Sequence, residues 1–483
     1  MFALTKEQVN RNAEFVYLQA SMASPSHRLY RLWGTVTDVA AGMLGIAGVS
    51  ELAGVGNEIV IEKQGQKIHG EILSVSGDSV TALLYSPSDI IRIGDVVHIE
   101  QEARIEPGDH WLGQIINYRG EVATEMPAGA GLTAKGVSRA LRAPALPAHL
   151  RHRLGPRLAT GWMVTDTLLP ICRGQRLGLF AGSGVGKSTF LGSLAGGLEA
   201  DRVVIALIGE RSREVGEFVN VNLPETVRHK TVVVSATASE SPGAKKRAAY
   251  CAMATAEHFR DQGHSVLFLF DSITRFAEAH REVALLAGET PALNAFPPST
   301  VRVIAELAER AGPGTGAKGD ITGIFSVLVA GSDLEEPVAD MIRGILDGHI
   351  ILSRNIAERG RYPAIDVLKS VSRALPAAAN DWENDLLRDY RRMIALYDEV
   401  APMLRASLFE FGRDKDADRA IALYPALDAF VSARNALGID AAFSAMSEIL
   451  NAGTFPAPGA PPAETPQPAA GQPVTRPPPR PRS

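Results

Sequence analysis

The stretch between Leu177 and Leu198 constrains the fold of this chain more than any other. An apolar run leads into the nine residues AGSGVGKST, and a helix-like sequence follows them. Glycines let backbone N–H groups converge on an anion, and the helix N-terminus adds partial positive charge. The spacing predicts a phosphate-binding P-loop, with Lys187 at the β- and γ-phosphates and the Ser188 hydroxyl on Mg²⁺. The residues expected around the phosphates are Gly182, Ser183, Gly184, Val185, Gly186, Lys187, Ser188 and Thr189.

One position departs from the usual P-loop pattern. The pattern opens with glycine, and this chain has Ala181 there, so the first turn must form without a positive φ angle. The alternative is a glycine-rich turn that binds nothing. We favour the phosphate-binding interpretation because the spacing, the preceding strand and the following helix agree.

Composition limits the class of protein. The 483 residues allow two to four domains, and 46% hydrophobic with 21% charged residues is ordinary for a globular protein. A net charge of -5 argues against a dedicated nucleic-acid binder. Cys172 and Cys251 lie far apart, which suits a reducing cytoplasm. Glu257, His258 and His264 lack metal-ligand spacing and are expected on a solvated surface. The chain has no apolar run long enough to span a membrane and no secretory signal pattern.

The first 101 residues contain two different periodicities. Residues 1–25 have the pattern of an amphipathic helix, which either packs on its own domain or docks on a partner or membrane surface. Residues 26–101 change to a period of two, with a hairpin turn at Gly77-Asp78. Several short strands at close spacing predict a small β-barrel or sandwich, and a structural or assembly role is favoured for it.

Residues 102–375 are expected to form the nucleotide-binding domain. Residues 126–147 are rich in Ala, Gly and Pro and predict irregular surface chain. From about Thr160 to Arg373, apolar strands alternate with helical patterns, which predicts an α/β fold: a mostly parallel sheet with helices on both faces. The strand candidates are 177–180, 202–208, 231–234, 266–270, 324–329 and 349–352.

The remaining residues divide into a helical and a proline-rich part. Residues 376–451 are expected to form a C-terminal helical domain, with residues 381–450 helical throughout and one apolar stripe from Leu386 to Tyr397. A second stripe is expected after Pro402, over Leu404, Leu408 and Phe411. Residues 452–483 are rich in proline and are predicted to be disordered.

Hydrolysis of a nucleotide needs carboxylates and positive charge beside the phosphate loop. Asp271 follows an apolar strand and is placed to hold the Mg²⁺ hydration shell, which makes it a metal-site residue together with Ser188. Glu210 follows the strand candidate 202–208 and is the candidate that orients the attacking water, with Glu214 as its rival. Arg373 is the candidate for charge on the phosphoryl group, although composition alone does not distinguish it among 49 basic residues.

Together, these blocks resemble the flagellum-specific export ATPases. That family is related to the injectisome type III secretion ATPases and to the catalytic subunits of the rotary ATP synthases. The resemblance covers roughly residues 26–450 and is most specific in the nucleotide-binding domain. The blocks that carry it are Thr160-Gly161, the run from Pro170 to Ser188, Gly209 to Glu214, Asp271 to Phe276 and Arg359 to Arg373.

The resemblance implies an architecture and a division of roles. It implies an N-terminal six-stranded barrel, a RecA-like nucleotide domain, a C-terminal helical domain and a homohexameric ring that hydrolyses ATP with Mg²⁺. It implies that Glu210 polarises the attacking water, that Arg211 lies nearby, and that Tyr362 stacks on adenine. It also implies that Arg373 enters the neighbouring subunit's site as an arginine finger, so a monomer should hydrolyse poorly. Ala181 is compatible with this branch.

The resemblance further implies partners and a location. These are a stator-like regulator docked on residues 1–25, export substrates and their chaperones, and a membrane export gate bound peripherally from the cytoplasm. Three alternatives remain. One is an injectisome ATPase, which shares the core motifs. Another is a Rho-like RNA translocase, disfavoured by the net charge and the lack of an aromatic–basic stripe. The third is a non-hydrolysing ring subunit, disfavoured by the presence of Glu210.

Overall fold

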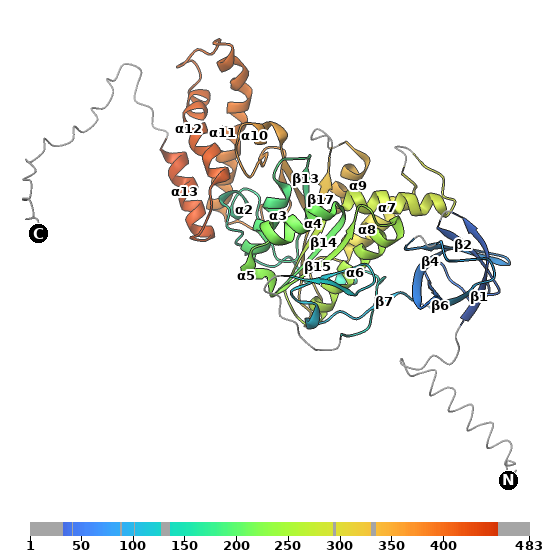
Figure 1. Cartoon of the computed structure of the whole chain (residues 1–483). Coiled ribbons are helices and arrows are strands. Elements are labelled where there is room, and N and C mark those ends of the chain that lie inside the picture. The colour runs from blue at the N-terminus through green and yellow to red at the C-terminus, as the bar shows by residue number, and fades with distance from the viewer. Residues whose placement is uncertain are drawn as a thin grey trace, which may run out of the picture.

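The computed structural model describes residues 32–40, 42–86, 89–100, 102–126, 136–292, 296–329 and 335–452. Figure 1 shows a barrel at one side, a sheet-and-helix core in the middle and a group of helices at the far side. The expected N-terminal helix (residues 1–25) and all but the first residue of the proline-rich tail lie outside the described residues. No helix in the described part is long and apolar enough to cross a membrane.

The barrel is closed and antiparallel, with the strand order β1-β2-β5-β4-β3-β6. Its core consists of alternate residues of each strand, such as Val36, Leu44 and Ile46, which are fully buried. The turn at Gly77-Asp78 joins β4 and β5, as predicted. The period of two predicts strands over residues 29–39, 57–63, 67–75, 79–85 and 95–100, so β2 was not predicted. The six strands are β1 (Leu32–Ala40), β2 (Met43–Ala47), β3 (Glu58–Lys63), β4 (Gln66–Ser76), β5 (Ser79–Leu84) and β6 (Val96–Glu100).

A nine-stranded sheet forms the core in the order β19-β18-β13-β17-β16-β14-β15-β8-β9. The strands from β18 to β8 are parallel to one another, and the edge strands β19 and β9 run antiparallel. The predicted mostly parallel sheet is therefore confirmed. Its strands are β8 (Gln114–Ile116), β9 (Val122–Glu125), β13 (Arg176–Ala181), β14 (Arg202–Glu210), β15 (Thr231–Thr237), β16 (Val266–Asp271), β17 (Ile321–Leu328), β18 (Gly348–Leu352) and β19 (Val371–Ser372).

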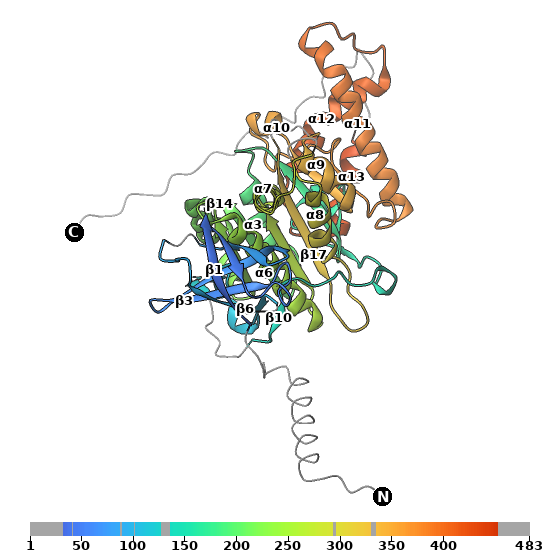
Figure 2. The same cartoon turned by 90° about the vertical axis from the view of Figure 1, so that its right-hand side faces the viewer.

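Alternation along the strands sends side chains to two separate cores. Leu177 and Leu179 of β13 belong to one cluster with α3 and the C-terminal helices, whereas Phe180 belongs to the other with α6 and α7. Helices therefore cover both faces of the sheet, as predicted (Figure 2). The helices of this region are α2 (Met163–Asp166), α3 (Lys187–Gly197), α4 (Ser212–Glu217), α5 (Glu225–Arg228), α6 (Pro242–Asp261), α7 (Ile273–Leu286), α8 (Ser299–Glu309), α9 (Pro337–Ile345) and α10 (Arg354–Glu358).

The segment between the barrel and the P-loop is more ordered than the sequence suggested. Its strands β8 and β9 extend the central sheet, and Met126 and Leu141 are buried. The prediction of irregular surface chain over residues 126–147 is confirmed for most of the described part of it, where only Arg139–Ala140 form a short strand and only Met126 and Leu141 are buried. The other short elements are η1 (Asp109–Trp111), η2 (Ala148–Leu150), η3 (Phe218–Asn222), β7 (Arg104–Ile105), β10 (Arg139–Ala140), β11 (Arg157–Leu158) and β12 (Ile171–Cys172).

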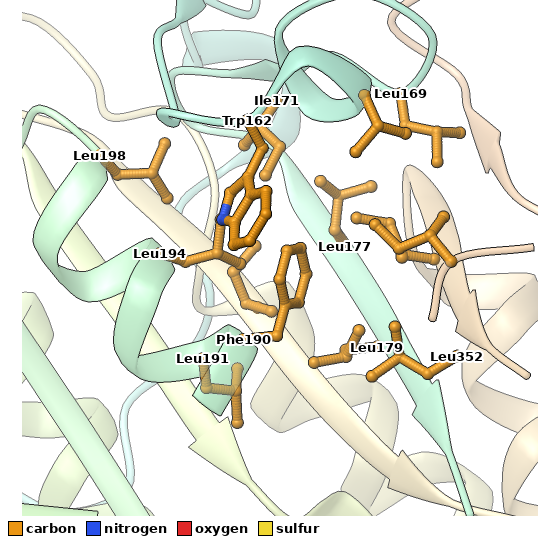
Figure 3. Close-up of a cluster of buried hydrophobic side chains, with 14 of the residues drawn as sticks. Trp162, Leu169, Ile171, Leu177, Leu179, Phe190, Leu191, Leu194, Leu198 and Leu352 are labelled. Carbon is orange, nitrogen blue, oxygen red and sulfur yellow. The ribbon is translucent and has the colours of Figure 1, made fainter. Parts of the chain in front are cut away.

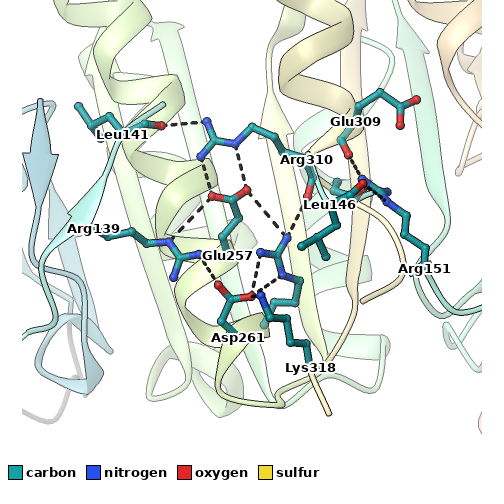
Figure 4. Close-up of polar contacts among 11 residues, drawn as sticks. Arg139, Leu141, Leu146, Arg151, Glu257, Asp261, Glu309, Arg310 and Lys318 are labelled. Carbon is teal, nitrogen blue, oxygen red and sulfur yellow. Dashed lines mark hydrogen bonds and ion pairs between the residues drawn. The ribbon is translucent and has the colours of Figure 1, made fainter. Parts of the chain in front are cut away.

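A buried network of charged side chains lies around Glu257 of α6 (Figure 4). The guanidinium of Arg310 donates two hydrogen bonds to the Glu257 carboxylate, at 3.0 and 2.6 Å, and both side chains are 2% exposed. Arg139 and Arg260 also face this carboxylate, at 4.0 and 3.9 Å. The prediction that Glu257 and His258 lie on a solvated surface was wrong, since their burial depends on partners distant in the chain.

Three helices form the C-terminal unit: α11 (Asp381–Arg405), α12 (Lys415–Ser432) and α13 (Ile439–Asn451). Asn380 and Glu383 form a capping box at the start of α11. The helix continues through Pro402 and ends at Arg405, and Ser407 adopts a positive φ of 57°. Leu408 and Phe411 therefore lie in the connection to α12 and are exposed, so the predicted second stripe and the continuous helix were wrong here. Figure 2 shows α11 and α12 projecting beyond the core.

Candidate active site

The P-loop joins the last residue of β13, Ala181, to the first residue of α3, Lys187. Gly184 and Gly186 have φ angles of 78° and 86°, which glycine adopts without steric cost. Ala181 is buried within the strand, and its carbonyl accepts a hydrogen bond from the Val329 N–H. The loop therefore turns through its later glycines and does not need a glycine at position 181.

The helix that carries Lys187 is fixed by its apolar side (Figure 3). Phe190, Leu191 and Leu194 are buried against β13 and the ring of Trp162. The indole N–H of Trp162 donates to the Ser193 hydroxyl of α3, at 2.5 Å. This packing sets the direction of the first turn of α3, where Lys187, Ser188 and Thr189 lie.

The other face of Trp162 connects α3 to the C-terminal unit. The guanidinium of Arg434, just after α12, lies 3.6 Å from the centre of the indole ring and donates to the Ser193 hydroxyl at 3.3 Å. The Asn435 side-chain amide donates to the carboxylate of Asp166, four residues after Trp162, at 2.6 Å. The helix of the P-loop is therefore in direct contact with the C-terminal unit.

Two carboxylates meet Lys187 at the carboxyl edge of the sheet. The ammonium nitrogen of Lys187 lies 2.5 Å from Asp271 Oδ1 and 3.6 Å from Glu210 Oε1. Asp271 ends β16 and Glu210 ends the neighbouring strand β14, so their approach follows from the parallel register. The structure thus brings together three predicted site residues, although Lys187 and Asp271 lie 84 positions apart in the sequence. Their side chains are 4–17% exposed.

The environment of this cluster shifts the pKa of Glu210. Burial and then the charge of Asp271 raise the pKa of Glu210 to about 7, against the opposing effect of Lys187. Burial alone lowers the pKa of Lys187, but the charges of Asp271 and Glu210 outweigh burial and raise it. A hydrogen bond with Glu210 lowers the pKa of Glu214. A glutamate with a pKa near neutrality in a dense charge cluster is typical of a functional site.

Glu210 reaches this position through a bulge at Gly209. The pairing of β14 with β15 shifts between Ile208 and Glu210, and Gly209 has a φ of 74°. A Cβ at Gly209 would lie 2.8 Å from the Cβ of Arg275 on α7. Glu210 is therefore the last residue of β14, rather than just beyond it as predicted, and Gly209 leaves room for Arg275.

Two residues near the cluster were not assigned from the sequence. Arg275 carries a charge that interacts with Glu210 and Glu214, and its guanidinium pairs with Glu278 at 2.8 Å. The sequence clue to Arg275 was its position four residues after Asp271, within the block from Asp271 to Phe276. Ser326 is fully buried on β17 and donates to Asp271 Oδ1 at 2.5 Å. Its only signal was a hydroxyl within an apolar strand.

The other P-loop residues and Arg211 lie around this cluster. Ser188 follows Lys187 in the first turn of α3, and the exposed Thr189 hydroxyl donates to Asn222 at 3.4 Å. The side chain of Arg211 is 77% exposed and pairs with Glu214 at 3.3 Å. Arg211 is therefore next to Glu210 in the chain, but it points toward solvent and not toward Lys187.

Tyr362 lies beside the P-loop. A Cβ built on Gly186 would lie 3.3 Å from Tyr362 Cδ1, and the tyrosine is 50% exposed. The two residues are far apart in sequence. The strand β18 is paired with β13 in the sheet, and the chain reaches Tyr362 shortly after β18 ends at Leu352. A half-exposed aromatic ring is thus next to the phosphate loop.

Arg373 is not brought to the P-loop of its own chain. Its N–H donates to the Asp347 carbonyl, and the Asp347 carboxylate accepts from the N–H of Arg176 at 3.0 Å. Arg176 begins β13, whereas the P-loop follows the end of that strand. The exposed Arg373 side chain therefore lies at the opposite edge of the sheet from Lys187.

The chemistry of the cluster fits a nucleotide with a divalent cation. Two positive-φ glycines and the start of α3 form a cradle of the kind that holds phosphates. Ser188 and Asp271 offer hydroxyl and carboxylate oxygens, which Mg²⁺ prefers. Asp271 is 4% exposed and oriented by Ser326, as a ligand held in place should be.

Comparison with known proteins places the chain in a family. Residues 161–372 match the family described as ATP synthase alpha/beta family, nucleotide-binding domain, and residues 380–448 match the T3SS EscN ATPase C-terminal domain. The chain is 41% identical over 429 residues to the flagellum-specific ATP synthase of Caulobacter vibrioides, which covers 87% of this chain and 96% of that protein.

Solved structures give the same assignment. The assembled ATPase EscN of the enteropathogenic E. coli type III secretion system matches with a TM-score of 0.79 at 32% identity, over 86% of this chain and all of EscN. EscN in complex with its central stalk EscO matches with a TM-score of 0.77, at the same identity and coverage. The chain is therefore an ATPase that belongs to the ATP synthase alpha/beta family, together with the flagellum-specific ATP synthases and the type III secretion ATPases.

Proposed function

We propose that this chain hydrolyses ATP to drive type III protein export during assembly of a bacterial flagellum, as a homohexamer with its sites between subunits. The observation that carries the chemistry is the approach of Lys187 to both Asp271 and Glu210. The flagellar assignment is supported by the name of the relative from Caulobacter vibrioides, which this chain matches over nearly its whole length.

The residues of the cluster have separate roles in this proposal. Lys187 and the backbone N–H groups of residues 182–189 bind the phosphates. Ser188 and Asp271 are the residues that would hold Mg²⁺, partly through water, and the ion would neutralise charge on the β- and γ-phosphate oxygens. Glu210 orients the attacking water, and its raised pKa suits a group that accepts a proton near neutral pH. Arg211 supports Glu210 through its pairing with Glu214.

Two further residues complete the site. Tyr362 stacks on adenine, which its exposed ring beside Gly186 favours. Arg373 acts as an arginine finger in the site of the next subunit. Its position at the sheet edge opposite Lys187 supports a role in trans, because it has no access to the P-loop of its own chain. Each chain thus contributes its P-loop to the site at one interface and its Arg373 to the site at the other interface.

The proposed partners follow the family. A stalk protein fits because EscN is found in complex with the central stalk EscO. We also propose a stator-like regulator that binds residues 1–25, export substrates with their chaperones, and peripheral association with the membrane export gate from the cytoplasm. The proposal includes no nucleic-acid partner, in keeping with the net charge of -5.

Catalysis is tested with Lys187→Ala and Glu210→Gln. Each should reduce ATP turnover by two orders of magnitude or more, since general-base and phosphate contacts contribute about 10²–10⁴-fold. Glu210→Gln should keep ATP binding, whereas Lys187→Ala should weaken it. The exposed Glu217→Gln on α4 is the matched control. Turnover at the wild-type rate in both variants would rule out the proposed site.

The role of Arg373 in trans is tested by mixing two inactive variants. Lys187→Ala retains Arg373, and Arg373→Ala retains Lys187, so a mixed ring contains some complete interfaces. With random assembly, turnover should recover to about a quarter of the wild-type value. Mixtures that stay as inactive as the separate variants would refute the role of Arg373 in the site of the next subunit.

An injectisome secretion ATPase is the second candidate, because EscN matches the chain over 86% of its length. Deletion of the gene separates the two. Loss of flagellar filaments and swimming supports the flagellar assignment, whereas normal swimming with loss of secreted effector proteins supports the injectisome.

A further inference from the structure

The turn that carries Tyr362 is held by the side chain of Arg361. We propose that Arg361 is a positioning residue: it fixes the Tyr362 ring beside the P-loop by tying the turn to α12, so that base recognition depends on the C-terminal helical unit. This inference rests on the proposed stacking of Tyr362 on the nucleotide base.

The Arg361 guanidinium makes three contacts that span the turn. Its Nη2 donates to the Ile365 carbonyl at 2.8 Å, and its Nη1 donates to the Pro363 carbonyl at 3.4 Å. Its Nε forms an ion pair with Asp428 Oδ1 of α12 at 3.0 Å. The Arg361 side chain is 12% exposed, so these contacts are largely shielded from water. One side chain thus closes the turn and connects it to another unit.

The turn is also attached to the central sheet on its other side. The Ser353 N–H donates to the Ala364 carbonyl at 2.8 Å, and the Asp366 N–H donates to the Ile351 carbonyl at 2.9 Å. Ala364 and Ile365 are fully buried, whereas Tyr362 is half exposed. The residues after Tyr362 are therefore anchored to β18, and Arg361 is the anchor on the side of Tyr362 itself.

The partner of Arg361 belongs to a well-packed helix. Asp428 follows Leu427, which is fully buried and whose carbonyl accepts a hydrogen bond from the Tyr390 hydroxyl of α11 at 2.6 Å. The packing of α11 on α12 therefore sets the position of Asp428. The ion pair with Asp428 in turn sets the position of the Arg361 side chain. Nothing in the P-loop contacts is needed to place this carboxylate.

Loss of the anchor should affect the base and not the phosphates. Stacking requires the ring at a defined place, and a ring that samples several places binds a base more weakly. The phosphate contacts arise from Lys187 and α3, which Arg361 does not touch. A change of this kind raises KM and leaves kcat unaltered, because it removes binding common to the ground state and the transition state.

The test uses the full chain with Arg361→Met and Asp428→Asn. KM and kcat are measured for ATP, and dissociation constants are measured for ATP and for inorganic tripolyphosphate, which has no base. Arg361→Met should raise KM about tenfold, and Asp428→Asn about threefold, with kcat within twofold of wild type and tripolyphosphate binding unchanged. Arg388→Met is the control, since Arg388 pairs with Asp385 on the exposed side of α11.

The outcomes separate this inference from the proposed function. Tyr362→Ala should weaken ATP binding at least as much as Arg361→Met. If Tyr362→Ala weakens ATP binding and both anchor variants leave it unchanged, the role of Arg361 is refuted and the role of Tyr362 stands. If Tyr362→Ala has no effect, the proposed stacking itself fails. Equal loss of ATP and tripolyphosphate binding in the anchor variants also refutes positioning of the ring. If Arg361→Met does not fold, Asp428→Asn gives the same decision.

Discussion

Replacement of Glu210 by Gln should make the nucleotide-free protein more heat-stable at pH 8 while it abolishes turnover. The reason is that the folded protein holds this carboxylate in an unfavourable place. Burial and the nearby charge of Asp271 disfavour its ionised form, and the pKa rises from the ordinary 4.5 to about 7. Glutamine has nearly the same shape and no charge to bury.

The sign and size of the effect follow from proton linkage. Between pH 4.5 and 7 the unfolded chain has released the Glu210 proton and the folded protein retains it, so stability falls as pH rises through this window. The full shift corresponds to at most about 3 kcal/mol, and partial exposure with loss of the Lys187 pairing reduces the gain to about 1–2 kcal/mol. For a domain of this size, such a gain raises Tm by roughly 2–6 °C.

The assay is thermal unfolding of wild type, Glu210→Gln and the control Glu217→Gln at pH 5 and pH 8. The Tm difference between Glu210→Gln and wild type should grow from near zero at pH 5 to several degrees at pH 8. Glu217→Gln should show no such growth, because its side chain is exposed. A Tm difference for Glu210→Gln that is equal at both pH values would refute the explanation by a raised pKa.

Two further predictions concern buried polar contacts. Ser326→Ala removes the hydrogen bond to Asp271 and should lower kcat about tenfold with little change in Tm. Ser326→Thr keeps the hydroxyl and should retain activity. Equal kcat in wild type and Ser326→Ala would contradict the orienting role of Ser326. Arg310→Met leaves Glu257 without its bidentate partner and should reduce the free energy of unfolding by about 3–5 kcal/mol, as measured by denaturant unfolding. A loss below about 1 kcal/mol would show that Arg139 and Arg260 are enough to stabilise the buried Glu257 carboxylate.

The sequence predicted the parts of the fold that depend on local pattern. The alternation of apolar strands and helices gave the parallel sheet, because each strand is buried on both faces and carries a continuous apolar run. Asp271 and Glu210 could be placed for the same reason, since both follow such runs and the carboxyl ends of parallel strands share one edge. The resemblance added Tyr362 and Arg373, for which the pattern alone gave no position.

The missed features depend on contacts between distant segments. Short strands such as β8 are stabilised by pairing with β15 more than by their own three residues. Glu257 appeared to be a surface residue because its partner Arg310 lies 53 positions away. Leu408 has helical spacing from Leu404, but the positive φ of Ser407 ends the regular structure between them. Ser326 looked like one more residue of an apolar strand until the structure placed it against Asp271.

The contact of Arg434 with Trp162 has a thermodynamic consequence. It joins the helix of the P-loop to the end of α12. The position of the helical unit therefore influences the position of α3, and with it the affinity of the P-loop for nucleotide. Any protein that binds one placement of α12 more tightly than another changes nucleotide affinity by some factor. By reciprocity, nucleotide changes the affinity for that protein by the same factor. The contact at the indole ring therefore couples nucleotide affinity to the binding of any protein that selects one placement of the helical unit.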